Sequence, residues 1–104
     1  MIKSASVAEL RQWMESNEVT LVDVREPDEY AHGSIAGSTL LPLATVTASA
    51  LPAFKGKKLV MQCRSGGRSR TACGKLLQEL PDQDIYNLEG GIMAWIQAGY
   101  EINM

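Results

Sequence analysis

The residues best suited to chemistry lie in one short segment, Lys58 to Thr71, with the sequence KLVMQCRSGGRSRT. Its apolar first part, 58–62, predicts a strand that leads directly into Cys63. Two glycines follow, and a helical repeat begins at Ser69. A cysteine at the carboxyl end of a parallel strand, ahead of a glycine-bearing loop and a helix, lies where open α/β sheets place their sites. Cys63 is therefore the candidate nucleophile.

The loop after Cys63 has features that would hold its sulfur as an anion. Gly66 and Gly67 tolerate backbone dihedrals that turn successive N–H groups inward, and such groups form an anion nest. The positive end of the following helix adds to this nest. Together with the arginines of the segment, these features are expected to lower the pKa of the Cys63 thiol without a histidine base. Those arginines are Arg64, Arg68 and Arg70.

Charge is distributed unevenly along the chain. Between Lys55 and Lys75 there are seven basic residues and no acidic one, whereas the rest of the chain holds three basic and all twelve acidic residues. Such a segment can attract small anions, and a solvated, lysine-rich approach to a strand would have the same composition. The net charge of −2 argues against nucleic acid as a partner.

Strands and helices are expected to alternate along the chain. Ser6 and Glu9 have the spacing of a capping box ahead of a helical repeat, and Pro27 stands where a helix can begin. Helices are predicted over 6–17, 27–33, 69–80 and 92–98, and more weakly over 44–51. Strands are predicted over 20–24, 39–41, 58–62 and 85–88. This alternation indicates an α/β fold, with a parallel sheet covered on both faces.

Length and composition limit the other possibilities. A chain of 104 residues with 45% apolar content fits one domain over residues 1–104. Its two cysteines and one histidine are too few for a disulfide scaffold or a zinc site, so no metal is expected, and His32 is interpreted as a turn residue. No apolar run reaches the roughly 20 residues that cross a bilayer, and no secretory signal opens the chain. We therefore expect a cytoplasmic protein without a membrane partner.

Five motifs, in order along the chain, resemble those of the rhodanese-like sulfurtransferase superfamily, and the whole resembles a single-domain rhodanese. They are LVDVREPDEY from Leu21, HGSIAGS from His32, LPL from Leu41, CRSGGRS from Cys63 and LEGGIMAW from Leu88. The resemblance implies a three-layer sandwich with a central, mostly parallel sheet of about five strands and helices on both faces. It also implies that Cys63 is the nucleophile and carries sulfur as a persulfide, which the loop amides stabilise.

The length of the loop separates the two chemistries known on this fold. In the family, sulfurtransferases typically have a six-residue loop, here Cys63 to Arg68. The related cell-cycle phosphatases and arsenate reductases have seven residues, with an arginine at the position that Ser69 occupies here. A ring of amides fitted to one sulfur atom is smaller than one that holds a tetrahedral phosphate. Persulfide chemistry is therefore favoured over phosphate or arsenate chemistry.

The resemblance implies thiosulfate sulfurtransferase (rhodanese) activity with no metal or organic cofactor. Cys63 would take sulfur from a small anionic donor such as thiosulfate. It would pass that sulfur to cyanide, a small thiol or a cysteine of a partner protein, with ping-pong kinetics. Arg64 makes mercaptopyruvate a less favoured donor, because enzymes that use it usually have glycine after the cysteine. A persulfide relay to a partner protein and a redox sensor are alternatives that use the same cysteine.

Binding and supporting roles also follow from the resemblance. The substrate-binding residues are expected to be Arg64, Ser65, Gly66, Gly67 and Arg68. Asp23 and Arg25 form the Asp-x-Arg pair of the family and, with Ser69, are expected to support the site, with Glu29 as a partner for Arg25. Cys73 is interpreted as a packed core side chain, the alternative being a resolving thiol.

Overall fold

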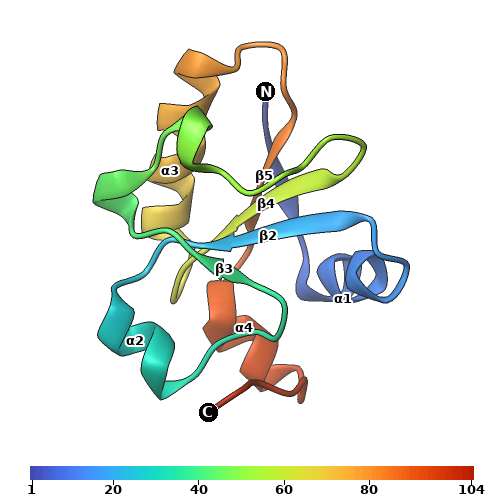
Figure 1. Ribbon diagram of the computed structural model, residues 1–104. Coiled ribbons are helices and arrows are strands. Elements are labelled where there is room, and N and C mark those ends of the chain that lie inside the picture. The colour runs from blue at the N-terminus through green and yellow to red at the C-terminus, as the bar shows by residue number, and fades with distance from the viewer.

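The computed structural model describes residues 1–104 and contains five strands, four α-helices and two short 3-10 helices (Figure 1). The strands are β1 (Ile2–Ala5), β2 (Val19–Asp23), β3 (Thr39–Leu40), β4 (Lys58–Gln62) and β5 (Ile85–Leu88). The helices are α1 (Val7–Glu15), α2 (Pro27–His32), α3 (Gly67–Glu79) and α4 (Gly91–Gln97), and the 3-10 helices are η1 (Leu43–Thr45) and η2 (Ala48–Ala50). None of the helices has the length and apolar character needed to cross a membrane.

The five strands form one sheet in the order β1-β5-β4-β2-β3, and every neighbouring pair is parallel. The predicted α/β fold with a sheet of about five strands is confirmed. β4 lies at the centre and ends at Gln62, so that Cys63 emerges at the carboxyl edge of the sheet. This is the edge where parallel α/β sheets place their sites.

Helices cover both faces of the sheet, as predicted, and each face has its own apolar cluster. On one face, α3 packs its buried residues, among them Cys73 and Leu76, against β4 and the segment that contains η1 and η2. On the other face, α1 and α4 contribute Leu10, Ile92 and Trp95. Helix α2 buries none of its residues and lies near the start of α4 at the carboxyl edge (Figure 1).

The sequence predicted the first residue of the helices to within two positions in α1 and α3. Ser6 caps α1, where its hydroxyl accepts a hydrogen bond from the Glu9 amide at 3.1 Å and the Glu9 carboxylate accepts one from the Ser6 amide at 3.0 Å. The helix ends at Glu15 rather than at Asn17, which adopts a left-handed conformation with φ of 56°. Helix α3 begins at Gly67, two residues before the predicted start, because the glycine turn itself forms its first turn.

The weak prediction of a helix over 44–51 was wrong. The segment forms the two 3-10 turns η1 and η2 instead, separated by the buried Val46. Three consecutive β-branched residues, Thr45 to Thr47, disfavour an α-helix at this point because their side chains are restricted at χ1.

Strand β1 was missed by the sequence analysis. Its residues Lys3 and Ser4 are exposed and only Ala5 is buried, so the segment lacks an apolar run or a regular alternation. Its pairing with β5, from Ile2 with Ile85 to Ala5 with Leu88, is a long-range contact that local patterns do not encode.

Candidate active site

Cys63 is held in place by its own main chain as well as by packing. The residue is only 1% exposed and follows the last residue of the central strand. Its carbonyl oxygen accepts a hydrogen bond from the Ile92 amide at 2.9 Å and another from Nε2 of Gln62 at 2.7 Å. The position of its sulfur is thus fixed relative to both β4 and α4.

Hydrogen-bond donors surround the Cys63 sulfur. The Gly66 amide lies 3.1 Å from Sγ and the Ser69 hydroxyl 3.3 Å from it, and the amides of Ser65 and Ser69 also donate toward it. Gly66 has a φ of 113°, a region that disfavours any residue with a side chain, whereas Gly67 does not need a positive φ. The loop therefore curls around the sulfur as the sequence analysis expected, with Gly66 as the glycine that permits it.

These donors set the charge state of the sulfur. Burial raises the pKa of the Cys63 thiol, but the hydrogen bonds from Ser69, Gly66 and Ser65 outweigh it, and the pKa lies below its ordinary value. The sequence analysis predicted a lowered pKa for the Cys63 thiol, but it did not predict the main cause. Hydrogen bonds are the largest causes that lower this pKa, and the charge of Arg68 also interacts favourably with the Cys63 thiolate.

Arg68 forms an ion pair across the mouth of the site with Glu29 of α2. Its Nη1 and Nη2 lie 2.6 and 2.9 Å from the two Glu29 carboxylate oxygens. The hydrogen bond from Arg68 lowers the pKa of Glu29 to about 2, and the Glu29 carboxylate raises the pKa of Arg68. Glu29 was expected to pair with Arg25; instead it offers Arg25 only its carbonyl oxygen, at 3.5 Å.

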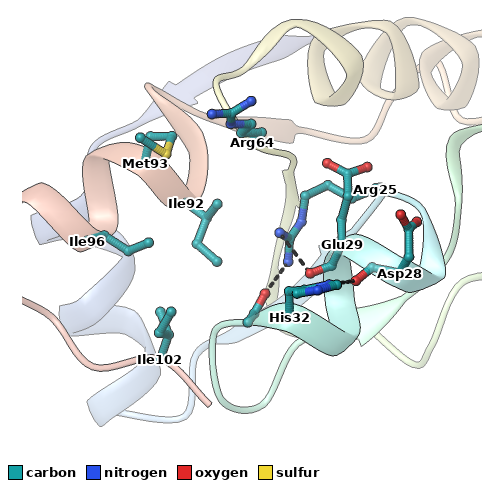
Figure 2. A pocket seen from close by; sticks show the side chains of 10 residues that line it. Arg25, Asp28, Glu29, His32, Arg64, Ile92, Met93, Ile96 and Ile102 are labelled. Carbon is teal, nitrogen blue, oxygen red and sulfur yellow. Dashed lines mark hydrogen bonds between the residues drawn. The ribbon is translucent and has the colours of Figure 1, made fainter. Parts of the chain in front are cut away.

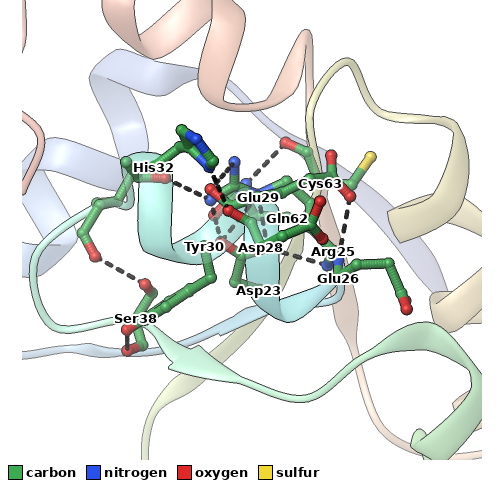
Figure 3. Close-up of polar contacts among 12 residues, drawn as sticks. Asp23, Arg25, Glu26, Asp28, Glu29, Tyr30, His32, Ser38, Gln62 and Cys63 are labelled. Carbon is green, nitrogen blue, oxygen red and sulfur yellow. Dashed lines mark hydrogen bonds and ion pairs between the residues drawn. The ribbon is translucent and has the colours of Figure 1, made fainter. Parts of the chain in front are cut away.

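Asp23 and Arg25 form a buried pair beside the loop (Figure 3). Nη2 of Arg25 lies 2.6 Å from Oδ2 of Asp23, and the Arg25 amide and Nε both donate to the same carboxylate. Nη2 also donates to the Gly33 carbonyl at 2.8 Å, at the end of α2. The pair thus joins the end of β2 to both ends of α2, which is the geometry of a structural support.

The basic segment from Lys55 to Lys75 does not form one continuous anion-binding surface. Lys57 bonds the Asn17 side chain, Lys58 lies over the Trp13 ring, and Lys75 bonds the Leu43 carbonyl, all away from the sulfur. Only two basic side chains near the loop, Arg64 and Arg70, have no hydrogen-bond or ion-pair partner. Arg64, next to Cys63, is the one that can meet an incoming anion.

Asn87 on β5 was missed by the sequence analysis. Its Nδ2 donates to the Gly66 carbonyl at 3.2 Å, and its Oδ1 accepts from the Ser69 hydroxyl. Because Ser69 has one hydroxyl proton, Asn87 and the Cys63 sulfur compete for it. A polar residue within the otherwise apolar and tyrosine-bearing strand IYNL was the signal that could have singled it out.

Cys73 and His32 lie outside the reacting centre. Cys73 is fully buried, its thiol lies 3.6 Å from the Tyr86 carbonyl, and burial raises its pKa to about 12. This is the environment of a packed core side chain. His32 is the exposed last residue of α2, and its Nδ1 lies 2.7 Å from the Asp28 carbonyl.

Helix α4 approaches the active-site loop so closely that only glycine fits at its first residue. A Cβ on Gly91 would lie 2.4 Å from the Cys63 carbonyl oxygen and 2.5 Å from the carbonyl carbon of Arg64. Gly91 also has a positive φ of 57°. The close approach lets the amides of Ile92 and Met93 reach the carbonyls of Cys63 and Arg64.

Removing the Ser69 hydroxyl should raise the pKa of Cys63, because one donor to the sulfur anion is lost. In Ser69→Ala, we expect the midpoint of the pH profile of Cys63 alkylation to rise and the rate at pH 7 to fall roughly three- to fivefold. Thr71→Ala is the matched control, since its hydroxyl lies on the same helix but bonds the Gly67 carbonyl. An unchanged midpoint in Ser69→Ala would contradict the role of this hydrogen bond.

Gly91→Ala should destabilise the fold more than the same change at Gly56. Both residues have a positive φ, but a Cβ on Gly56 would meet nothing within 4 Å. We expect Gly56→Ala to cost about 1 kcal/mol and Gly91→Ala to cost about 1–3 kcal/mol more because of the clash. Denaturant unfolding of the two variants measures the difference, and equal losses would show that α4 can move away from the loop.

Sequence and structure comparisons place this geometry in a known family. Residues 6–98 match the model of the rhodanese-like domain. A protein of Allochromatium vinosum named sulfurtransferase is 38% identical over 88 residues, 85% of this chain and 81% of that protein. An uncharacterised protein of Synechocystis sp. is 42% identical over 93 residues, 86% of this chain, which spans 50% of that relative. The crystal structure of a rhodanese-related protein from Thermoplasma volcanium has a TM-score of 0.82 at 32% identity and covers 97% of both chains. The chain belongs to the rhodanese-like domain family.

Proposed function

We propose that this protein is a thiosulfate sulfurtransferase that carries sulfur as a persulfide on Cys63 between an anionic donor and a thiophilic acceptor. The observation that carries the proposal is the ring of donors around the Cys63 sulfur, which lowers the pKa of its thiol despite burial. Relatives named as sulfurtransferases support sulfur transfer as the class of reaction. We expect it to act in the cytoplasm, where free thiols persist.

In the first step, the Cys63 thiolate attacks the outer sulfur of thiosulfate. A new S–S bond forms to Cys63, the S–S bond of thiosulfate breaks, and sulfite leaves with the bonding electron pair. Arg64 is next to the nucleophile and exposed, so its unpaired guanidinium can offset the charge of the approaching donor and of the departing sulfite. Arg68 is less available because Glu29 already binds it.

The loop amides stabilise the persulfide that remains. They surround the Cys63 sulfur, and a persulfide, like a thiolate, is anionic and accepts hydrogen bonds. In the second step, the acceptor attacks the outer sulfur, the S–S bond to Cys63 breaks, and its electron pair returns to the Cys63 thiolate. No metal or organic cofactor enters either step, and the two half-reactions give ping-pong kinetics.

Brief exposure of the reduced protein to thiosulfate should add one sulfur atom to Cys63. The persulfide forms because hydrogen bonds lower the pKa of the Cys63 thiol and so raise the thiolate fraction, and because sulfite is a good leaving group. Intact-mass measurement after desalting detects the gain, which cyanide should reverse. Cys63→Ser is the control and should gain nothing, since the pKa of the remaining Cys73 thiol is about 12. A folded parent protein that gains no sulfur from thiosulfate or other sulfane donors would refute the proposal.

Arg64→Gln should slow sulfur transfer from thiosulfate more than transfer from a neutral sulfane donor such as elemental sulfur, whose ring of sulfur atoms opens when the Cys63 thiolate attacks it. The guanidinium interacts with donor charge, so we expect kcat/KM for thiosulfate to fall about tenfold and that for elemental sulfur to change much less. Arg70→Gln is the matched control, because Arg70 is an exposed arginine on α3 whose charge acts on Cys73 rather than on Cys63. Equal losses for both donors would remove the assigned role of Arg64.

A further inference from the structure

A groove between α2 and α4 lies beside the active-site loop, and of its lining residues the chemistry described so far uses only Arg64 (Figure 2). Its volume is about 340 Å³. One wall is apolar and comes from α4, with Ile92, Met93 and Ile96, and the facing wall from α2 includes Asp28 and His32. Since a water molecule takes about 30 Å³, the groove is several times larger than cyanide or thiosulfate requires.

Both walls of the groove are fastened to the loop that carries Cys63. On the α4 side, the Ile92 and Met93 amides donate to the carbonyls of Cys63 and Arg64 at 2.9 and 3.1 Å. On the α2 side, the Glu29 carboxylate binds Arg68 at the other end of the loop. A molecule seated in the groove is therefore held at a fixed position relative to the nucleophile.

The α4 wall exposes apolar surface that the fold does not cover. Four large apolar side chains are exposed in this protein, and two of them, Met1 and Met104, are the chain ends. The other two are Met93, 38% exposed, and Ile96, 44% exposed, and both line the groove. Exposed apolar side chains gathered beside a reactive centre indicate contact with another molecule.

The α2 wall offers a negative charge to the same molecule. The Asp28 carboxylate contacts no cation, unlike Glu29, which is bound by Arg68. The His32 ring donates from Nδ1 to the Asp28 carbonyl, so Nδ1 carries a proton. The groove thus combines an apolar wall with the unpaired carboxylate of Asp28 on the α2 side and the unpaired guanidinium of Arg64 on the loop side. The α2 side suits an apolar group next to a cationic one.

We propose that this groove binds the segment of a partner protein that carries the acceptor cysteine, with an apolar side chain packed on Met93 and Ile96 and a basic one paired with Asp28. The proposal rests on the proposed function, because the acceptor thiolate attacks the outer sulfur of the Cys63 persulfide. The partner cysteine gains the S–S bond, the bond to Cys63 breaks, and the electron pair returns to Cys63.

The test uses the full chain with its persulfide preformed and the capped peptide Gly-Leu-Cys-Lys-Gly as the acceptor. The rate constants of sulfur transfer to this peptide and to cyanide are measured in single-turnover experiments, and their ratio is compared among variants. Met93→Ser/Ile96→Ser removes the apolar contact and Asp28→Asn the charge. Asp82→Asn is the matched control, since Asp82 is an exposed carboxylate in the turn between α3 and β5.

We expect the peptide-to-cyanide ratio to fall about tenfold in the double variant and severalfold in Asp28→Asn, with no change in Asp82→Asn. Because cyanide has no side chain to bind, the ratio isolates binding in the groove from the chemistry at Cys63. An unchanged ratio in both groove variants would overturn the proposal and leave the persulfide chemistry intact. Failure of the parent protein to form a persulfide would overturn the proposed function and the groove assignment together.

Discussion

A buried sulfur anion needs hydrogen-bond donors, and the structure around Cys63 depends on meeting that need. Burial alone would raise the pKa of the Cys63 thiol, because a charged sulfur loses its hydration there. Each N–H group that donates to the sulfur offsets part of this free-energy cost. Neither a strand nor a helix alone has many N–H groups that are free to donate to one sulfur atom. The loop from Cys63 to Arg68, whose last two residues begin α3, supplies them because it brings the amides of successive residues to one point. The left-handed conformation of Gly66 is the local requirement of that loop.

Turning the N–H groups of the loop inward turns its carbonyl groups outward, and these also need partners. They are supplied by β5 and α4. The first amides of α4, which have no partner within their own helix, bind the carbonyls of Cys63 and Arg64, while Asn87 binds that of Gly66. Two sets of unpaired groups, the loop carbonyls and the N-terminal amides of a helix, thus satisfy each other. Gly91 is the residue that lets the two main chains come close enough.

The sequence predicted the parts of this arrangement that depend on local patterns. The run before Cys63, the glycines and the repeat after Ser69 located β4, the loop and α3, and the family motifs identified the sheet. Contacts between residues far apart in the sequence were harder to predict. The partner of Glu29 proved to be Arg68, thirty-nine positions away, because a sequence does not show that α2 faces the loop. β1 was missed because its exposed residues lack an apolar pattern, and Asn87 because its contacts with Gly66 and Ser69 join residues far apart in the sequence. The extent of the domain, 1–104, remains a prediction.

The hydrogen bonds that complete the loop also determine what surrounds it. The position of α4 is set by its main-chain amides, which bind the loop carbonyls, by the close approach at Gly91, and by the buried side chains of Ile92 and Trp95. Met93 and Ile96 can therefore be exposed beside the active-site loop without weakening the contacts that hold Cys63 in place. The same separation holds for α2, where Glu29 and the contacts of Arg25 fix the helix while Asp28 stays unpaired. The contacts that hold the two helices in place are thus separate from the exposed side chains of Met93, Ile96 and Asp28, and under the proposed function those side chains are free to bind the acceptor.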